Sequence, residues 1–333
     1  MNHNLFSPFH RLIGRIDERF LNRRSSRLLL CHETLTKDIK ALLEIDSSQY
    51  AAFLSVFNVR DSLEGVFRLI RFQNHQERSW SDEFFSVSLS RDFSVINIRK
   101  EIIAVKNPED PRIFFLHEIP YVFLNTWDGP WIYNYFTKKT VKLSIRSFAP
   151  YSLDKNWTPF VDGDKLYFIY SFSPLTILSC EPSTGICDLV QGEPASSAEA
   201  FVLRGGTAAL KFGDSFVGIA HSNIRTKLVM RHRPHIFVMK KDPFRLVFVG
   251  PPLSVGGDLI QDPCNIFKHE GEYYLSMTVS YGAWTYPNRS ITMKIVHLLD
   301  FEKNITQILT DHDLPLRDTD ERICRYYKAG IFC

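Results

Sequence analysis

Residues 109–124 have the sequence EDPRIFFLHEIPYVFL, and this stretch decides the fold of the chain. Two apolar segments flank a short polar turn, which is the pattern of a β-hairpin. Asp110 and Arg112 lie at the start of the first strand, and Pro111 restricts the backbone between them. An acid next to a cation provides one candidate proton-transfer group and one candidate anion ligand, although Asp-Pro is also a common turn dipeptide.

The same arrangement recurs along the chain. A polar start, a strand, a tight turn and a second strand led by an aromatic residue occur again from Asn156, Arg204 and Gln261. The leading aromatic residues are Tyr121, Tyr167, Phe216 and Tyr273. A degenerate earlier unit comprises residues 53–57 and 66–69. Five units of about 50 residues are typical of propeller blades, so we predict an all-β, five-bladed β-propeller rather than a β-sandwich or two small β domains.

Residues 1–48 have a different pattern. Apolar residues at helical spacing predict one helix over residues 9–20 and a second from Thr34 through Ile45. We therefore predict a short N-terminal helical extension over residues 1–48 and a catalytic propeller domain over residues 49–333. The basic cluster at residues 23–27 is compatible with a solvated turn, or with contact to a nucleotide or an anionic membrane surface.

Composition excludes several classes of function. The net charge of +3 gives no electrostatic support to nucleic-acid binding. No apolar run is long enough to span a membrane, and the N-terminus has no apolar signal core, so we expect at most peripheral membrane contact and a cytoplasmic location. The six cysteines include no CxxC pair, which favours reduced thiols.

In a propeller, the polar starts converge on one mouth of the central channel. Candidate anion ligands there are Arg112, Arg204-Gly205-Gly206-Thr207, His221, Arg231 and His235. Candidate sugar ligands are Lys155, Asn156, Trp157, Asp262 and Tyr281. Glycine lets backbone amides approach an anion, and tryptophan stacks on sugar rings. The alternatives are a β-bulge for the glycines, a core position for Trp157 and a structural role for His221.

The implied chemistry is one carboxylate facing several cations, an arrangement suited to transfer of a group to or from a phosphate or a nucleotide. No Cys or His set has zinc spacing, and no P-loop or nucleophile elbow occurs. We predict neither a metal nor a cofactor. Hydrolysis by a pair of carboxylates, Asp110 and Asp262, stays open as an alternative.

The ordered motifs resemble a family of five-bladed propellers, the β-mannoside phosphorylases and the related β-1,2-mannosyltransferases. They are the sequences EDPR at 109–112, KNWTPF at 155–160, YSFSP at 170–174, RGGT at 204–207 and HS at 221–222. The resemblance covers roughly residues 50–300. It implies an inverting, metal-independent reaction in which Asp110 is the single general acid or base. One departure is that Tyr281-Gly282 is followed by no acid, which leaves the identity of the sugar open.

On this resemblance, Arg112, Arg204 and His221, with Arg231 or His235, would hold a phosphate or a nucleotide diphosphate. Asn156, Trp157 and Asp262 would hold the sugar. The leading hypothesis is a β-mannosyltransferase that takes GDP-mannose or a sugar 1-phosphate as donor and a glycan as acceptor. The alternatives are a β-mannoside phosphorylase, with inorganic phosphate as a partner, and a non-catalytic propeller that binds glycans.

Overall fold

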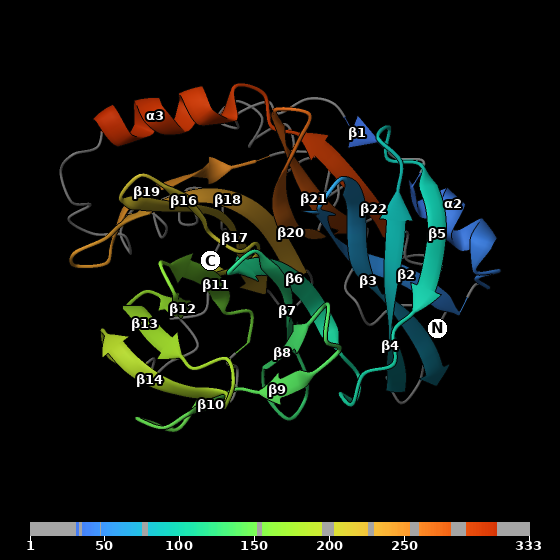
Figure 1. Cartoon of the computed structure of the whole chain (residues 1–333), viewed down its shortest axis with the longest axis horizontal. Coiled ribbons are helices and arrows are strands. Elements are labelled where there is room, and N and C mark those ends of the chain that lie inside the picture. The colour runs from blue at the N-terminus through green and yellow to red at the C-terminus, as the bar shows by residue number, and fades with distance from the viewer. Residues whose placement is uncertain are drawn as a thin grey trace.

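The repeat units fold as five antiparallel blades arranged side by side around a ring (Figure 1). The computed structural model describes residues 31–32, 35–46, 48–74, 79–151, 155–194, 203–225, 230–253, 260–280 and 291–311. The prediction of an all-β, five-bladed propeller is confirmed.

The first three blades are sheets of their own. Blade 1 contains β2 (Gln49–Val59), β3 (Ser62–Asn74), β4 (Ser79–Leu89) and β5 (Val95–Lys100). Blade 2 contains β6 (Glu109–Leu116), β7 (Ile119–Asn125), β8 (Trp131–Asn134) and β9 (Thr140–Lys142). Blade 3 contains β11 (Thr158–Asp162), β12 (Lys165–Phe172), β13 (Leu175–Cys180) and β14 (Ile186–Gln191), with β10 (Ser144–Ile145) parallel to β14.

Blades 4 and 5 are joined by one parallel pair, His232 with Ile260. In blade 4, β15 (Leu203–Gly205) and β16 (Leu210–Phe212) both pair with β17 (Ser215–Arg225), which is followed by β18 (Met230–Lys240) and β19 (Arg245–Pro252). Blade 5 contains β20 (Ile260–His269), β21 (Glu272–Ser280) and β22 (Ile291–His297), and its outer strand is β1 (Cys31–His32). A segment from near the N-terminus therefore completes the last blade.

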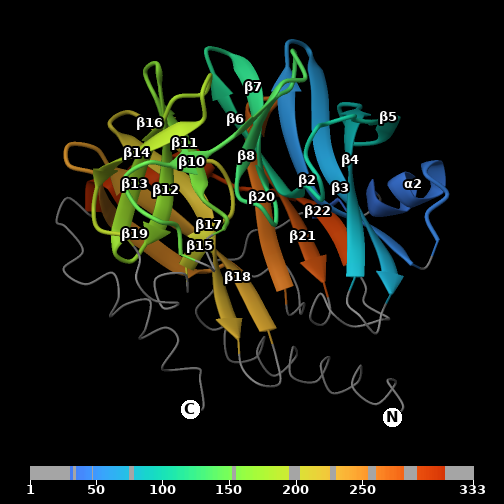
Figure 2. The same cartoon turned by 90° about the horizontal axis from the view of Figure 1, so that it is seen from below.

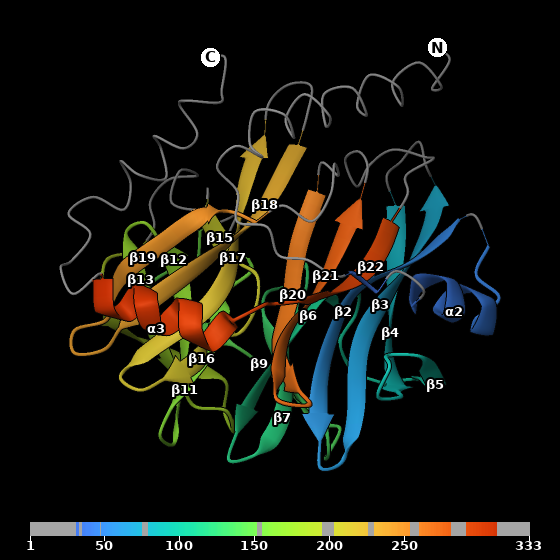
Figure 3. The ribbon, with the colours of Figure 1, turned by 90° about the horizontal axis from the view of Figure 1, so that it is seen from above.

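Within the part of the chain that the structure describes, two helices cover the outside of the ring (Figure 3). The amphipathic helix α2 (Leu35–Leu42) buries Leu35 and Ile39 against blades 1 and 5, which confirms the helix predicted from Thr34. Helix α3 (Phe301–Asp311) buries Phe301 and Ile305 against blades 4 and 5. The helix predicted over residues 9–20 lies outside the described residues, and the division at residue 48 stays a prediction. Among the described residues, no helix is long and apolar enough to cross a bilayer.

The inner strands begin at one end of the propeller, which we call the mouth. The β2–β3 and β6–β7 hairpins lie at the opposite end, the upper one in Figure 2. Near the mouth, φ is +57° at Phe53, +49° at Asp110 and +66° at Asn156. The register of β6 on β7 shifts between Glu109 and Arg112, as in a β-bulge. Bulges change the direction of side chains, and here they bring side chains of neighbouring blades together.

The expectation of reduced thiols throughout is wrong for one pair. Cys180 on β13 and Cys187 on β14 are cross-strand partners and form a disulfide, whereas Cys264 is a buried free thiol. The seven-residue separation looked like a simple turn in the sequence, but antiparallel pairing places the two residues opposite each other. Without support from reduced thiols, the cytoplasmic location stays a prediction.

Candidate active site

Asp110 lies buried at the mouth between blades 1 and 2, where it accepts a hydrogen bond from an arginine of the neighbouring blade. Arg68 Nη1 on β3 lies 2.9 Å from Asp110 Oδ1. The same guanidinium binds Asp82 on β4 through Nε at 2.9 Å and Nη2 at 3.2 Å. We call Arg68, Asp82 and Asp110 the acidic wall.

Arg68 is the centre of the acidic wall. Its guanidinium carbon lies 5.3 Å from the ring centroid of Phe53, the residue with left-handed backbone on β2. Burial raises the pKa of Asp82 to about 6, and Arg68 opposes this rise. Burial favours the neutral form of Arg68, but the nearby carboxylates outweigh it and raise the pKa of Arg68. Arg68 is therefore a fixed cation shared by two carboxylates.

Arg112, a predicted phosphate ligand, has a different role. Its side chain is buried and donates to the carbonyl oxygens of Gly206, Gly205 at 3.0 Å and Asp110 at 3.2 Å. It therefore fastens β6 of blade 2 to blade 4. Arg112 therefore contributes positive charge near the mouth, but it donates its hydrogen bonds to backbone carbonyl oxygens. The prediction that Arg112 binds an anion directly is thereby corrected.

The segment Gly205-Gly206-Thr207 is also structural. A Cβ at Gly205 would lie 2.2 Å from the carbonyl oxygen of Asn156, and one at Gly206 would lie 2.4 Å from that of Ile219. The Thr207 side chain is buried and donates to the carbonyl of Ala208, and its amide donates to Ile219. The glycines permit close contact between blades. This corrects the prediction of an anion-binding loop.

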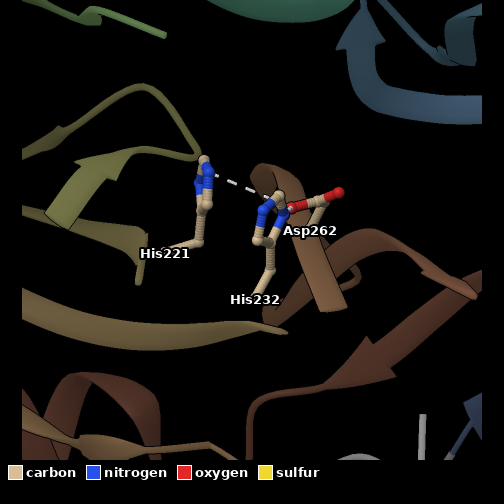
Figure 4. A group of neighbouring side chains, drawn as sticks. All are labelled: His221, His232 and Asp262. Atoms are coloured by element: carbon tan, nitrogen blue, oxygen red, sulfur yellow. Dashed lines mark hydrogen bonds and ion pairs between the residues drawn. The ribbon is translucent and has the colours of Figure 1, made fainter. Parts of the chain in front are cut away.

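A second cluster lies at the junction of blades 4 and 5. Figure 4 shows His221, His232 and Asp262 pointing toward one another from β17, β18 and β20. Asp262 Oδ1 lies 2.6 Å from His232 Nδ1 and 4.0 Å from His221 Nε2. With its amide oriented to suit both neighbours, Asn223 donates to His232 Nε2 at 3.1 Å and accepts from Arg204 at 3.2 and 3.3 Å. We call Arg204, His221, Asn223, His232 and Asp262 the basic wall.

The basic wall favours an anion. Burial lowers the pKa of His221 well below its usual value, and His232, Arg112, Arg204 and Lys155 lower it further. His221 is therefore neutral at pH 7 and can donate or accept a hydrogen bond.

His221, His232 and Asp262 offer donor atoms within 4.8 Å of one another, which could hold a metal ion. However, the carboxylate is already hydrogen-bonded to His232. Arg112, Arg204 and Lys155 all add positive charge nearby, as their effect on the pKa of His221 shows. These positive charges would repel a divalent cation, and only the carboxylate of Asp262 in this cluster would attract it. We conclude that the charges suit an anionic ligand better than a metal ion.

Two predicted anion ligands, Arg231 and His235, lie on the face of β18 opposite to the basic wall. The pairing of β17 with β18 is regular, so side chains alternate between the two faces of the blade. His232 lies on the same face of β18 as Val238, which packs toward blade 5. Arg231 and His235 lie on the opposite face, together with Phe237, which packs toward blade 3. His235 is buried against the carbonyl of Gly250 at 3.0 Å, and burial lowers its pKa to about 4. Neither residue belongs to the basic wall.

The predicted sugar ligands divide into three groups. Lys155 is exposed at the mouth, 3.5 Å from Glu109, and Asp262 lies in the basic wall. Asn156 is buried and exchanges two hydrogen bonds with Asn125, at 2.7 and 3.0 Å, across blades 2 and 3. Trp157 is only 1% exposed and packs among core aromatic side chains, so the prediction that it stacks on a sugar is wrong. Tyr281 lies outside the described residues.

Two contributors to the acidic wall, Arg68 and Asp82, were missed from the sequence, and Asn223 and His232 of the basic wall were not among the predicted ligands. Arg68 belongs to the first repeat unit, which is degenerate and starts with apolar residues. The signal available was the position of Arg68 on a second strand, comparable to His221 in the fourth unit. Asp82 lies on a third strand, where the repeat pattern gave no polar signature.

The five-bladed fold is similar to the folds of several solved carbohydrate-active enzymes. A solved glycosyl hydrolase from Bacteroides ovatus has a TM-score of 0.52 and 10% identity, over 74% of this chain and 83% of that one. A second solved structure comes from the GH130 family of mannoside phosphorylases, which is described as containing glycoside hydrolases that target β-1,2-mannosidic linkages in Candida mannan. It has a TM-score of 0.50 and 11% identity, over 74% of this chain and 83% of that one. At such identities the likeness concerns the fold alone.

Sequence comparison supports the predicted resemblance. A family model described as Beta-mannosyltransferases matches residues 130–239. Beta-mannosyltransferase 3 of Candida albicans is 34% identical over 131 residues, 33% of this chain and 24% of that protein. Beta-mannosyltransferase 4 of Komagataella phaffii is 34% identical over 136 residues, 36% and 27%. The similarity to the β-mannosyltransferase family is confirmed, and the matching region spans about a quarter of these relatives.

The matched region has a specific place in the fold. Residues 130–239 extend from the end of the β7–β8 loop to β18, and so include Lys155, Arg204, His221 and His232. Asp110 and Arg68 precede the matched region, and Asp262 follows it. The match therefore covers most of the basic wall, whereas the acidic wall rests on the geometry of blades 1 and 2.

Proposed function

We propose that this chain is an inverting β-mannosyltransferase in which Asp110 acts as the single general base. The observation that carries the proposal is a buried carboxylate on one side of the mouth and a neutral histidine with Arg204 on the other. The similarity of residues 130–239 to β-mannosyltransferases supports mannose as the transferred sugar. The donor is a sugar nucleotide or a sugar 1-phosphate, and the acceptor is a glycan.

In the proposed reaction, an acceptor hydroxyl attacks the anomeric carbon of the donor sugar and the bond to the phosphate oxygen breaks. The proton of that hydroxyl passes to Asp110, directly or through a substrate hydroxyl. The leaving phosphate gains negative charge, which Arg204 and Lys155 stabilise while His221 donates a hydrogen bond. Arg68 keeps Asp110 in place, because its other hydrogen bonds to Asp82 fix the guanidinium.

The test is to incubate the chain with GDP-mannose, or with mannose 1-phosphate, together with β-mannobiose. We expect release of GDP or phosphate and formation of a mannotriose, with the configuration at the anomeric carbon inverted relative to the donor by proton NMR. Formation of mannose 1-phosphate from mannobiose and phosphate would show instead that the chain is a phosphorylase. Neither product with either donor would contradict both activities and leave a glycan-binding propeller.

A further inference from the structure

The hydrogen bonds of the basic wall run in one direction, from Arg204 to Asp262. A guanidinium donates hydrogen bonds and cannot accept them, so Arg204 fixes the orientation of the Asn223 amide. Two guanidinium nitrogens of Arg204 lie 3.2 and 3.3 Å from the Asn223 amide oxygen, which therefore faces them. The amide nitrogen of Asn223 then lies 3.1 Å from His232 Nε2 and donates to it. His232 must consequently accept a hydrogen bond at Nε2.

The tautomer of His232 follows from this order. A neutral imidazole that accepts at Nε2 carries its proton on Nδ1. His232 Nδ1 lies 2.6 Å from Asp262 Oδ1, so it donates to this carboxylate. In the opposite order, the amide nitrogen of Asn223 would face the N–H groups of Arg204, and two donors would oppose each other. Arg204, Asn223, His232 and Asp262 therefore form a directed series, in which every donor meets an acceptor in one arrangement.

The strands hold this series from its buried end (Figure 4). Asn223 on β17 is the register partner of His232 on β18, and Arg204 on β15 is the register partner of His221 on β17. His221 and Asn223 are two residues apart, so these side chains share one face of blade 4. The side chains of His232 and Asp262 are only 12% and 7% exposed, whereas Arg204 is partly buried. The series thus leads from buried groups to a cation near the mouth.

An arginine that is held in advance binds an anion at a lower entropic cost. A long side chain loses rotamer freedom when it becomes ordered, and prior ordering removes this cost from the binding step. The guanidinium has several N–H donors, so it can bind Asn223 and an anion at the same time.

We propose that Asn223 and His232 are positioning residues that hold Arg204 in place for the phosphate of the sugar donor. The inference rests on the proposed function, from which it takes the phosphate. Both ring nitrogens of His232 are engaged within the series, and Asn223 acts through Arg204, so neither residue needs to contact the donor.

The experiment measures anion binding separately from turnover. GDP and inorganic phosphate are titrated by calorimetry into the unmodified protein and into Asn223→Ala, Arg204→Ala, the double variant and Asn58→Ala. Asn58 is the matched control, because its amide also joins two blades, by donating to the carbonyl of Lys268, but it lies near the end of β2 opposite the mouth.

The double-mutant cycle separates positioning from an independent role. We expect the Kd for both probes to rise about tenfold in Arg204→Ala, about fivefold in Asn223→Ala and not at all in Asn58→Ala. Asn223→Ala should have no further effect once Arg204 is replaced, because it acts only through Arg204.

His232→Phe tests the buried end of the series. The substitution keeps a planar ring and removes both hydrogen bonds of His232, so it should raise the Kd for the same probes about as much as Asn223→Ala does. It, too, should have no further effect in the Arg204→Ala background.

The outcomes separate this proposal from the proposed function. An unchanged Kd in Asn223→Ala would overturn the positioning role, and so would additive effects of Asn223→Ala and Arg204→Ala. The absence of binding of both probes by the unmodified protein would overturn it as well. Transfer from GDP-mannose or mannose 1-phosphate to β-mannobiose, measured on the same proteins, judges the proposed function by itself. If the probes bind with the expected pattern but no transfer occurs, the positioning of Arg204 stands and the transferase is contradicted.

Discussion

The two walls of the mouth are built by different means. The acidic wall is assembled from ion pairs between side chains of blades 1 and 2, with Arg68 bound to both Asp82 and Asp110. In the basic wall, the regular pairing of β15, β17 and β18 sets Arg204, His221 and His232 on one face, and a chain of hydrogen bonds leads through Asn223 to Asp262.

This difference has a consequence for stability and for chemistry. The acidic wall depends on one buried cation, so the loss of Arg68 leaves Asp82 and Asp110 without it. The basic wall distributes its interactions over five residues, and Arg204 is only partly buried. We therefore expect substitutions in the acidic wall to affect folding or the chemical step strongly, and substitutions in the basic wall to affect mainly ligand binding.

The largest expected effect is that of Asp110→Asn on turnover. Amide replacement removes the proton acceptor, and we expect kcat to fall by about 10² to 10⁴-fold. Arg68 stays paired with Asp82, so the melting temperature should change little. Steady-state kinetics and thermal unfolding of the same preparation check both points, and an unchanged kcat would sink the proposed role of Asp110.

Arg68→Met should have the largest effect on folding. The substitution leaves the buried Asp82 carboxylate without its cation, and we expect the free energy of unfolding to fall by about 3–5 kcal/mol. The matched control is Arg71→Met on the same strand, where the side chain is 44% exposed and pairs with Glu83. That control should change the unfolding free energy by less than about 1 kcal/mol. If urea denaturation gave the same loss of unfolding free energy for Arg68→Met and Arg71→Met, the proposed stabilising role of Arg68 in the acidic wall would be contradicted.

Arg204→Ala tests the basic wall. We expect the KM for the donor to rise about tenfold, because a charge-assisted hydrogen bond to phosphate is lost, and the melting temperature to change little. Lys211→Ala serves as the control, since Lys211 is an exposed cation of the same blade that pairs with Asp162 away from the mouth. A collapse of the melting temperature in Arg204→Ala, with donor KM unchanged, would assign Arg204 a structural role.

The pH dependence of stability should reveal Asp82. Its pKa is raised to about 6 in the folded chain, so the native state holds a proton that the unfolded state has released above about pH 4. The contribution of Asp82 to stability is therefore lost as the pH rises from about 4 to 6, by about 3 kcal/mol in all, since each pH unit in this range contributes about 1.4 kcal/mol. The difference in unfolding free energy between the unmodified chain and Asp82→Asn, measured across this range, should show that slope. A flat difference would contradict it.

The smallest expected effect is that of a chelator. Because the positive charges of Arg112, Arg204 and Lys155 act on His221, we expect dialysis against EDTA to leave transfer activity and melting temperature unchanged. Loss of activity that Zn²⁺ or Mn²⁺ restores would show that His221, His232 and Asp262 bind a metal, contrary to this expectation.

Much of the architecture was predictable from the sequence, because each blade repeats the same local pattern. The polar starts at Asp110, Arg204 and Asp262 marked the mouth, and the aromatic residues after each turn marked the second strands. The corrections share one cause. The residue types of Arg112, Trp157 and His235 suit ligand binding, and they lie near the polar starts in the sequence, but all three are buried in the folded chain.

The sequence by itself determined the strand pattern, the five repeats and the end of the ring at which polar residues gather, since these follow from local periodicity. Only the tertiary structure decided which polar side chains face the channel. That choice depends on the bulge at Asp110, on the register of β17 with β18 and on the ion pair that joins Arg68 of blade 1 to blade 2. Each is a contact between residues distant along the chain, or a departure from regular alternation, which local patterns do not encode.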